Sequence, residues 1–447
     1  MAGSGPPDDS NVRRTWTGLY VPNWYDESSE PDISPLDAEA YETQLDALAQ
    51  FEAHPEIRCI WEFDLSQGPL QGLSFAPGAT QIRGTDYWIV CPFVPGKLFI
   101  HSPVVSRAGR FQYALSHTVL FDSNIYSRIV RFVERPELLS AAEERGVRTL
   151  LETLIVRKYD YQLMPYMIES FAKKVNEFTY DYARRGTRAI LSLHMMDKEH
   201  FLATGSVRPD PGALSAYEVR FGTTDLDSIV TDQLQGYVNP PPTPIPVTIF
   251  TIVLLKMVLI RRCLIPTRSF DAQWSAFDDF FFSRLGIYSG QARTMALFYF
   301  SGKLDHWIKT QQNSDPEQAL DLLTNSAWDL YLGSLPQHVL AHSPESEPVL
   351  CHFCTREAEL AELLSASLIQ ALRVSKTGGF VPFLNISTDL LHSAIGPGSQ
   401  KSLALADERA ARFLKERESG TTRRIDENSL SVLVTEVKAM FRALLGR

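Results

Sequence analysis

The sequence predicts an α/β protein together with an N-terminal α+β module. Two observations predict this class. Short apolar runs, such as Thr118–Phe121 before Asp122, are followed by helix-length segments. At 447 residues the chain is too long for one ordinary core, and its 44% hydrophobic residues can fill more than one.

Composition narrows the functional class. The 43 basic and 53 acidic residues give a formal net charge of -10, so a contact with nucleic acid would need a local basic surface. Five cysteines in a chain of this length predict a reducing compartment rather than a disulfide framework. The first ten residues are polar and contain no apolar signal core, so we expect a cytoplasmic protein.

The N-terminal region mixes short apolar runs with Pro and Gly. Residues 1–15 are expected to form a disordered tail, and residues 16–112 an α+β accessory module. Apolar residues on one face predict a helix over Asp37–Phe51. The apolar and alternating runs in this module predict three strands, over Ile57–Phe63, Tyr87–Phe93 and Lys97–His101.

From residue 113 the pattern changes to strands followed by helices, which predicts a second domain over 113–375 with a helical insertion at about 200–315. Helical periodicity is expected over Arg135–Val156, Pro165–Tyr182, Glu317–Tyr331 and Ala358–Arg373. Buried strands are expected over Thr187–Met195 and Pro348–Cys354, and a loop-rich stretch over Gly205–Pro244. Residues 376–447 predict a C-terminal helical extension, which includes a helix over Glu427–Leu445.

One apolar segment, Val247–Ile260, is long enough to be compared with a membrane span. It has 14 residues and contains Lys256, whereas a span needs about 20 apolar residues. The segment follows a Pro-rich linker, Pro240–Pro244, which is a suitable start for a helix. We therefore expect a buried core helix and no stable membrane insertion.

Four acids occur in comparable local contexts. Asp122 ends a strand, Glu169 lies in an apolar stretch of helix, Asp329 lies alone among apolar neighbours, and Glu357 follows a strand and opens a helix. Acids at the ends of strands in open α/β sheets are placed where such sheets bind ligands and metals. Together the four predict a carboxylate cluster that could hold a divalent metal.

The ordered set resembles the PIN-like metal-dependent nucleases. Asp122-Ser123-Asn124 matches the Asp-x-Asn/Thr that ends the first strand of that family, and Glu169 resembles its Glu in a small apolar helix. Asp329 resembles the Asp on a helix before a strand. Thr355-Arg356-Glu357 matches the Thr-x-Asp element with Glu in place of Asp. The resemblance implies a three-layer sandwich with a parallel central sheet.

The resemblance also implies metal-dependent hydrolysis of a phosphodiester, with an endoribonuclease as the leading function. Asp122 and Asp329 would bind Mg²⁺ or Mn²⁺ directly, and Glu169 and Glu357 would complete a second metal or act through water. Glu357 thus joins Asp122 and Asp329 among the expected metal ligands, and all four acids are candidate catalytic residues. Asn124 and Thr355 would orient waters or carboxylates around the metal.

Structural alternatives exist for each of these residues. An acid after a strand, such as Asp122, commonly serves as the N-cap of the next helix, and Glu357 could favour its helix N-terminus electrostatically. Glu169 and Asp329 could face solvent or pair with an arginine. The corresponding functional alternative is a non-catalytic interaction or scaffold protein that retains a PIN-like fold and binds a protein partner.

A basic patch at Arg184, Arg185 and Arg188 is the candidate nucleic-acid contact. Aromatic residues nearby, including Tyr180 and Tyr182, would allow it to follow the backbone of RNA or of single-stranded DNA. Such runs are also typical of a solvated helix face.

The spacing of Cys351 and Cys354 is that of half a zinc site. A second pair does not occur in the sequence, and positions three apart on a strand point to opposite faces. We therefore expect buried structural thiols.

Overall fold

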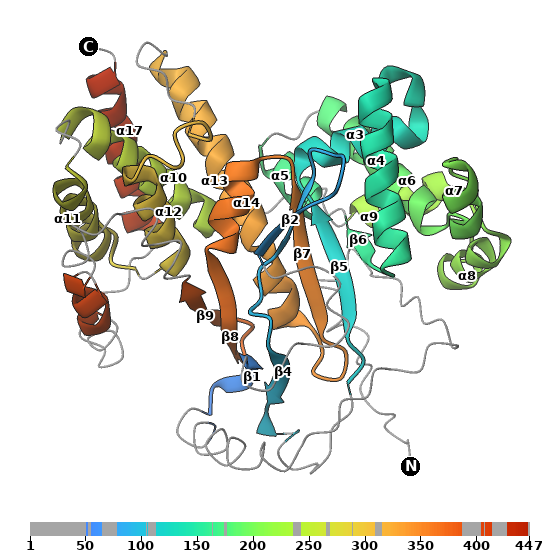
Figure 1. Ribbon diagram of the computed structural model, residues 1–447, viewed down its shortest axis with the longest axis horizontal. Coiled ribbons are helices and arrows are strands. Elements are labelled where there is room, and N and C mark those ends of the chain that lie inside the picture. Colours follow the sequence, from blue (N-terminus) through green and yellow to red (C-terminus); the bar gives the residue numbers. More distant parts are fainter. Residues whose placement is uncertain are drawn as a thin grey trace, which may run out of the picture. The chain divides into compact units, whose positions relative to one another are not determined.

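The computed structural model describes residues 51, 55–64, 78–103, 105, 113–162, 164–173, 177–235, 243–264, 269–287, 289–308, 315–386, 404–405, 407–413 and 427–445. It shows a mixed α/β protein in which helices predominate and one of two β-sheets contains parallel strands (Figure 1). The predicted 1–15 tail, and the predicted Asp37–Phe51 helix except Phe51, lie outside these residues.

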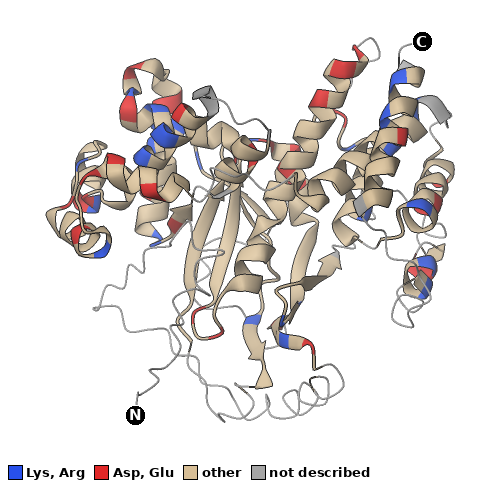
Figure 2. Cartoon of the chain, turned by 180° about the vertical axis from the view of Figure 1, so that it is seen from behind, with Lys and Arg blue, Asp and Glu red and all other residues tan. Residues whose placement is uncertain are grey.

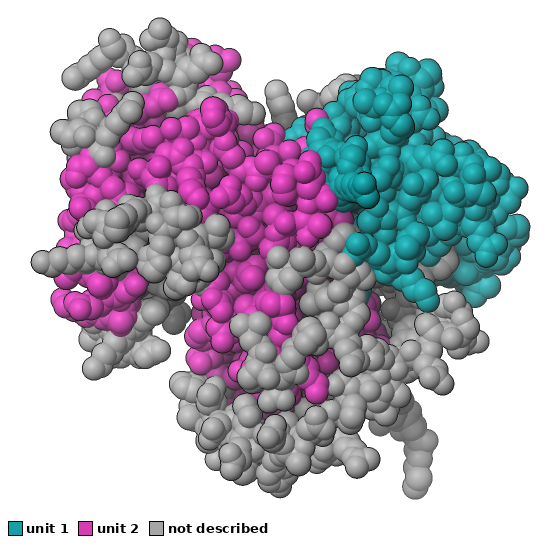
Figure 3. Space-filling view, viewed as in Figure 1, with its two compact units in different colours: residues 1–31, 82–87, 117–242 teal, residues 32–81, 88–116, 243–447 magenta. Residues whose placement is uncertain are grey.

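The chain divides into two compact units (Figure 3). Unit 1 comprises residues 1–31, 82–87 and 117–242, and unit 2 comprises residues 32–81, 88–116 and 243–447. These boundaries differ from the predicted division into 16–112, 113–375 and 376–447. The predicted division assumed that strands neighbouring in the sequence pair. Two strands from residues 57–91 instead pair with strands that begin after residue 348, and this pairing assigns both sets of strands to one unit.

Unit 1 begins with a strand–helix–strand–helix sequence. The strands β5 (Ser116–Phe121) and β6 (Asp160–Gln162) pair in parallel. The connecting helices are α3 (Ser123–Glu134), the 3₁₀ turn η3 (Pro136–Leu138), and α4 (Ala141–Val156), which starts with a complete capping box at Ser140 and Glu143. The predicted strand at Thr118 and the predicted helix ending at Val156 are confirmed.

The second half of unit 1 consists, in its described residues, of helices joined by loops. It contains α5 (Met164–Lys173), α6 (Glu177–His194), α7 (Lys198–Thr204), α8 (Pro211–Phe221) and α9 (Leu226–Gln235).

Two predictions fail in this helical half. The strand predicted over Thr187–Met195 is wrong, because that segment is the end of α6, and a short apolar run does not distinguish a strand from a buried helix. The loop predicted over Gly205–Pro244 is also wrong, since it contains α8 and α9. Asp210 before Pro211 and Gly222 at the C-cap are the start and stop signals of α8.

Unit 2 contains an antiparallel four-stranded sheet. Its strands are ordered β4 (Lys97–His101), β1 (Ile57–Asp64), β8 (Ser367–Ser375) and β9 (Phe380–Ile386). The strand β9 forms one edge of this sheet, contains Pro382, and exposes Val381 and Phe383. The strands predicted near Ile57 and Lys97 are confirmed.

Three more strands of unit 2 pair in antiparallel fashion. They are β2 (Gly78–Gln81), β3 (Trp88–Cys91) and β7 (Val349–Thr355), with β3 between the other two. The helix predicted over Ala358–Arg373 is half wrong: α14 (Ala358–Ser365) ends there and β8 begins. The alternating burial of β8 shows that sheet pairing determined its conformation.

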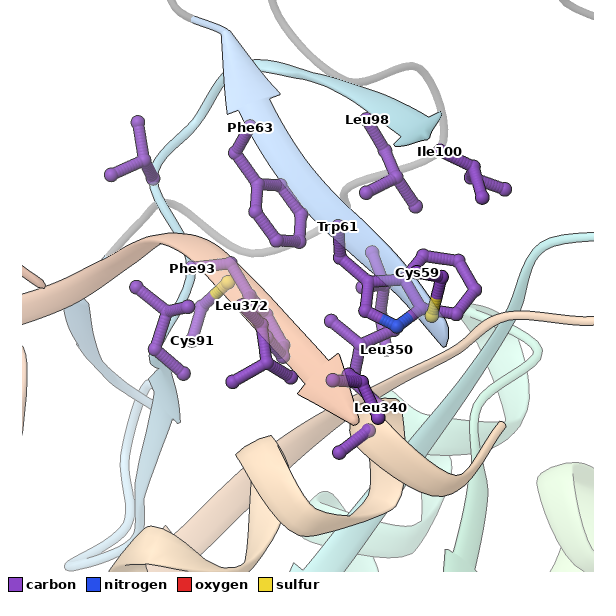
Figure 4. Packing of buried hydrophobic residues seen from close by; sticks show 14 of the residues in the cluster. Cys59, Trp61, Phe63, Cys91, Phe93, Leu98, Ile100, Leu340, Leu350 and Leu372 are labelled. Atoms are coloured by element: carbon purple, nitrogen blue, oxygen red, sulfur yellow. The ribbon is translucent and has the colours of Figure 1, made fainter. Parts of the chain in front are cut away.

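A hydrophobic cluster joins residues of the two sets of strands in unit 2. Cys59, Trp61 and Phe63 of β1 meet Leu372 of β8 and Leu350 of β7 (Figure 4). The rings of Phe63 and Phe93 are stacked with centroids 4.9 Å apart. The cluster therefore joins residues from β1 and β3–β4 to residues some 250–300 positions later in one core.

The helices of unit 2 surround a central apolar one. The helix α10 (Ile245–Leu259) packs against α13 (Pro316–His342) and α17 (Glu427–Leu445), and it is buried along most of its length, as predicted for a core helix. Among the described residues, none of the helices has the length and apolar character that crossing a membrane requires.

The remaining helices of unit 2 include two π-helical turns. After α10 comes η4 (Ile260–Leu264), and between α11 (Phe270–Phe280) and α12 (Gly290–Phe300) comes η5 (Phe281–Leu285). The charged residues of the protein gather on its helices, whereas β5 and β7 carry none (Figure 2). The carboxylates nearest to these two strands in the sequence are therefore those just beyond their ends.

Candidate functional site

Asp122 lies directly after β5, at the N-cap position of α3. It has the extended backbone of an N-cap (φ -60, ψ 150) and is 1% exposed. Its carboxylate nevertheless makes no capping hydrogen bond with the described first turn of α3. The Ser123 hydroxyl donates to Asp122 Oδ1 at 3.3 Å. The capping alternative therefore does not explain this carboxylate.

Glu169 lies in α5 and is 7% exposed, so the solvent-facing alternative does not hold for it. Leu120 of β5 pairs in parallel register with Gln162 of β6, and a helix begins two residues after the described end of each strand. Carboxyl ends of parallel strands share one sheet edge. The structure thus places the start of α3, with Asp122, and the start of α5 at the same edge within unit 1.

Glu357 occupies the matching place in unit 2, at the N-cap position of α14 after β7. It too makes no side-chain capping hydrogen bond with the described residues of that helix. Instead, the Glu357 backbone N–H donates to Oγ1 of the fully buried Thr355 at 3.1 Å. Thr355 thus fixes the turn from which Glu357 projects.

The two other predicted residues, Asp329 and Asn124, lie within helices. Asp329 lies within α13 and is partly buried, between the buried Trp328 and Leu330. Asn124 is exposed in the first turn of α3, where its backbone oxygen accepts a hydrogen bond from Ser127 Oγ at 3.0 Å.

The four acids are thus divided evenly between the units, with Asp122 and Glu169 in unit 1 and Asp329 and Glu357 in unit 2. Across the part of the chain that the structure describes, no three or more His, Cys, Asp or Glu side chains form a group able to hold a metal ion.

The predicted basic patch is matched by acids of the same unit. Arg184 and Arg188 of α6 both contact Asp227 of α9, at 3.2 Å and 3.3 Å. Arg185 contacts Glu134 of α3 at 2.7 Å. The guanidinium groups therefore neutralise local carboxylates, which reduces the positive potential that a phosphate backbone would meet.

The cysteine pair on β7 behaves as predicted. Cys351 and Cys354 are buried and reduced, as are Cys59 and Cys91. Burial raises the pKa of the Cys59 and Cys91 thiols to about 11. Thiols of this kind are poor nucleophiles at neutral pH, which is consistent with a packing role.

Sequence reasoning missed a buried ionic cluster in unit 2. Asp278 of α11 is 2% exposed, and its Oδ1 lies 3.9 Å from Nε of the equally buried Arg293 of α12. Arg409 contacts Asp278 at 3.4 Å and Asp279 at 2.6 Å, and so holds residues 407–413 against α11. Burial raises the pKa of Asp278, although Arg293 and Arg409 oppose this effect.

A pocket of about 310 Å³ adjoins this cluster, with Phe282 and Phe413 forming part of its wall. A buried acid with a raised pKa beside a pocket is typical of functional sites, but structural ion-pair networks produce it as well. Here Arg409 forms ion pairs with Asp278 and Asp279, which favours a structural role for Asp278. The available sequence signal was Asp278 itself, an acid inside an aromatic-rich helix.

Comparison with known proteins leaves the function to be inferred from these residues: the chain matches no protein-family model, no curated protein and no solved structure.

Proposed function

We propose that the chain is a divalent-metal-dependent phosphodiesterase of the PIN-like class that acts on RNA in the cytoplasm. The observation that carries the proposal is Asp122, a carboxylate buried just beyond a strand that takes the N-cap position of α3 without capping it. Glu357, which is partly exposed, also takes an N-cap position after a strand without capping its helix. A metal ion is one of the interactions that can offset the cost of burying a carboxylate.

Each unit offers one pair of acids to a metal. Asp122 and Glu169 of unit 1, and Asp329 and Glu357 of unit 2, have carboxylate oxygens, which are the ligands that Mg²⁺ and Mn²⁺ prefer. When bound, the metal would lower the pKa of a water molecule and neutralise charge on the scissile phosphate. In unit 1, Asp122 would bind an ion and Glu169 would support it. In unit 2, Asp329 would bind an ion, Glu357 would support it, and Thr355 would fix the turn from which Glu357 projects.

Asn124 is the residue best placed to meet the substrate, because it is exposed and follows Asp122 by only two residues. Its side-chain amide can donate to a phosphate oxygen or accept from a ribose hydroxyl. Arg184, Arg185 and Arg188 would contact the nucleic-acid backbone only by exchanging their carboxylate partners for phosphates. Such an exchange is inexpensive, because exposed ion pairs contribute only about 0–1 kcal/mol.

A calorimetric titration with Mn²⁺ tests the metal site in the full chain. We expect saturable binding by the wild type and a loss of affinity of more than about 100-fold in Asp122→Asn, since even supporting residues around a metal contribute 10–100-fold. Asp329→Asn reports separately on the unit 2 acids. Asp210→Asn is the matched control, because Asp210 is an N-cap acid of unit 1 that does cap its helix; its affinity should be unchanged.

Cleavage of RNA and of single-stranded DNA in the presence of Mn²⁺ tests the reaction. The wild type and Asp210→Asn should cleave RNA, and Asp122→Asn should not. Full activity in Asp122→Asn would exclude the proposed role of this carboxylate.

One observation favours a second candidate, a non-catalytic interaction protein. Each arginine of the predicted nucleic-acid patch already contacts an acid of unit 1. A folded wild type that binds no Mn²⁺ and cleaves neither substrate would support this candidate over the nuclease.

A further inference from the structure

The pocket beside the ionic cluster of unit 2 combines aromatic, acidic and basic side chains in one wall. It has a volume of about 310 Å³ and lies where α11 and η5 meet the helical residues 407–413. This volume is at the lower end of the range for small-molecule sites in proteins, which is about 300–1,000 Å³. The pocket therefore suits a single small molecule rather than a polymer chain.

The aromatic part of the wall comes from the π-helical turn η5. Its Phe282 is only partly buried, and the ring centroid of Phe282 lies 5.0 Å from that of Phe413, with the two planes inclined by 42°. π-helical turns frequently occur at functional sites. A phenyl ring that is accessible from a pocket can stack on a planar ligand.

Two acids of the wall share an arginine. Arg409 donates to Oδ1 of Asp279 at 2.6 Å and to Oδ2 of the buried Asp278 at 3.4 Å. The Asp279 side chain is 63% exposed, and a carboxylate can accept more than one hydrogen bond, so a ligand can still donate to it. An ammonium group on the ligand would lie beside the guanidinium of Arg409 and be repelled by it. The favoured donor is therefore a neutral N–H group.

A second arginine of the wall, Arg412, is available to an anion. It is exposed and follows Arg409 by three residues, a spacing that places both side chains on one helix face. Within the described part of the chain, Arg412 forms no ion pair. The hydroxyl of Ser283, which is exposed in the same wall, can also donate. A guanidinium and a hydroxyl are typical donors to a phosphate group.

We propose that this pocket binds one nucleoside monophosphate whose base carries an exocyclic amine. The base stacks on Phe282, its neutral amine donates to Asp279, and its phosphate accepts from Arg412 and Ser283. Uracil fits less well, because its N3–H lies between two carbonyl oxygens that a carboxylate repels. The inference goes beyond the proposed function, since the pocket lies in unit 2 and its wall contains none of the four acids proposed to bind metal.

Calorimetric titration of the full chain with AMP, CMP, GMP and UMP tests the site. The titrations contain EDTA, so that the outcome does not depend on a bound metal. We expect saturable binding of at least one amine-bearing nucleotide, and binding of UMP that is about tenfold weaker, as for the loss of one hydrogen bond to a charged group. Inorganic phosphate and L-phenylalanine are the two further probes, since each offers only part of the proposed ligand.

Two variants test the assigned contacts, and one serves as a control. Arg412→Gln removes the charge that meets the phosphate and should weaken binding by about tenfold. Phe282→Leu keeps an apolar side chain but removes the ring, and should also weaken binding by about tenfold. Arg284→Gln is the matched control, because Arg284 is an exposed arginine of the same turn that pairs with Glu436 and lies outside the wall of this pocket; its affinity should equal that of the wild type.

Several outcomes would overturn the assignment. A folded wild type that binds none of the nucleotides excludes it. Inorganic phosphate that binds as tightly as the nucleotides reduces the pocket to a simple anion site, and L-phenylalanine that binds in their place shows a different ligand class. An unchanged affinity in Arg412→Gln and Phe282→Leu places the nucleotide elsewhere on the chain. Each of these results leaves the Mn²⁺ titration, and with it the proposed function, to be decided separately.

Discussion

Two acids of unit 1, Asp210 and Asp122, occupy the same formal position and behave differently. Asp210 precedes α8, is partly exposed, and its Oδ1 accepts from the Gly212 N–H at 2.6 Å and the Ala213 N–H at 3.4 Å. Asp122 precedes α3, is buried, and leaves the described first turn of its helix without a side-chain cap.

The difference shows that an acid directly before a helix need not be a capping residue. Asp210 satisfies N–H groups that its helix would otherwise leave to water, so its contribution is to stability. Asp122 makes no such capping hydrogen bond, so the helix that follows it does not explain why an acid is placed there. A buried acid that does not cap its helix is a stronger functional candidate than one that does.

The largest expected effect that tests this contrast is on stability. Asp210→Ala should lower the free energy of unfolding by about 1 kcal/mol, because two N–H groups lose their acceptor. Asp122→Ala removes no capping hydrogen bond, so it should lack this loss. Urea unfolding of both variants, monitored by circular dichroism, measures the difference. Equal losses in the two variants would remove the distinction between the two acids.

A smaller effect is expected in unit 2, where Thr355 rather than the Glu357 side chain orders the entry to α14. Thr355→Val keeps the shape of the side chain and removes the acceptor of the Glu357 N–H. We expect a loss of about 0.5 kcal/mol, the low end of the range for one hydrogen bond. Glu357→Gln, which keeps that hydrogen bond, is the control and should unfold like the wild type. A Thr355→Val variant as stable as its control would show that the hydrogen bond does not matter.

The smallest effect is confined to acid conditions. Asp197 caps α7 through the His200 N–H and contacts Arg208, and these interactions hold its pKa below the ordinary 3.8. A carboxylate with a lowered folded-state pKa contributes stability above 3.8 that is lost as the pH falls through its folded-state pKa. Asp197→Asn should therefore flatten the acid end of the stability curve. Measurements of unfolding between pH 5 and 2 would test this, and an unchanged curve would contradict it.

Sequence patterns correctly predicted the elements whose conformation depends on residues next to one another in the chain. The Val247–Ile260 run was recognised as a buried helix because it is short for a membrane and apolar on all sides, and α10 has this character. The strand before Asp122 was recognised from its apolar run and the polar residues after it. In each case the neighbouring residues contain the information.

Other features depend on partners far along the chain. The segment after Ser365 becomes β8 because β1, some 300 residues earlier, pairs with it. Asp278 is buried because Arg409, 131 residues away, packs over it. For the candidate site, the sequence placed Asp122 after its strand, but it could not distinguish this acid from Asp210. Burial and the direction of the carboxylate separate the two, and both come from tertiary packing.

The edge strand β9 has a consequence for how copies of the protein behave at high concentration. Val381 and Phe383 are exposed on an outer strand, and such a strand is a template on which a second chain can add its own. Pro382 between them has no N–H to donate, so an incoming strand would meet an interrupted ladder. Pro382 should therefore disfavour pairing of β9 with the edge strand of a second molecule, and so disfavour aggregation.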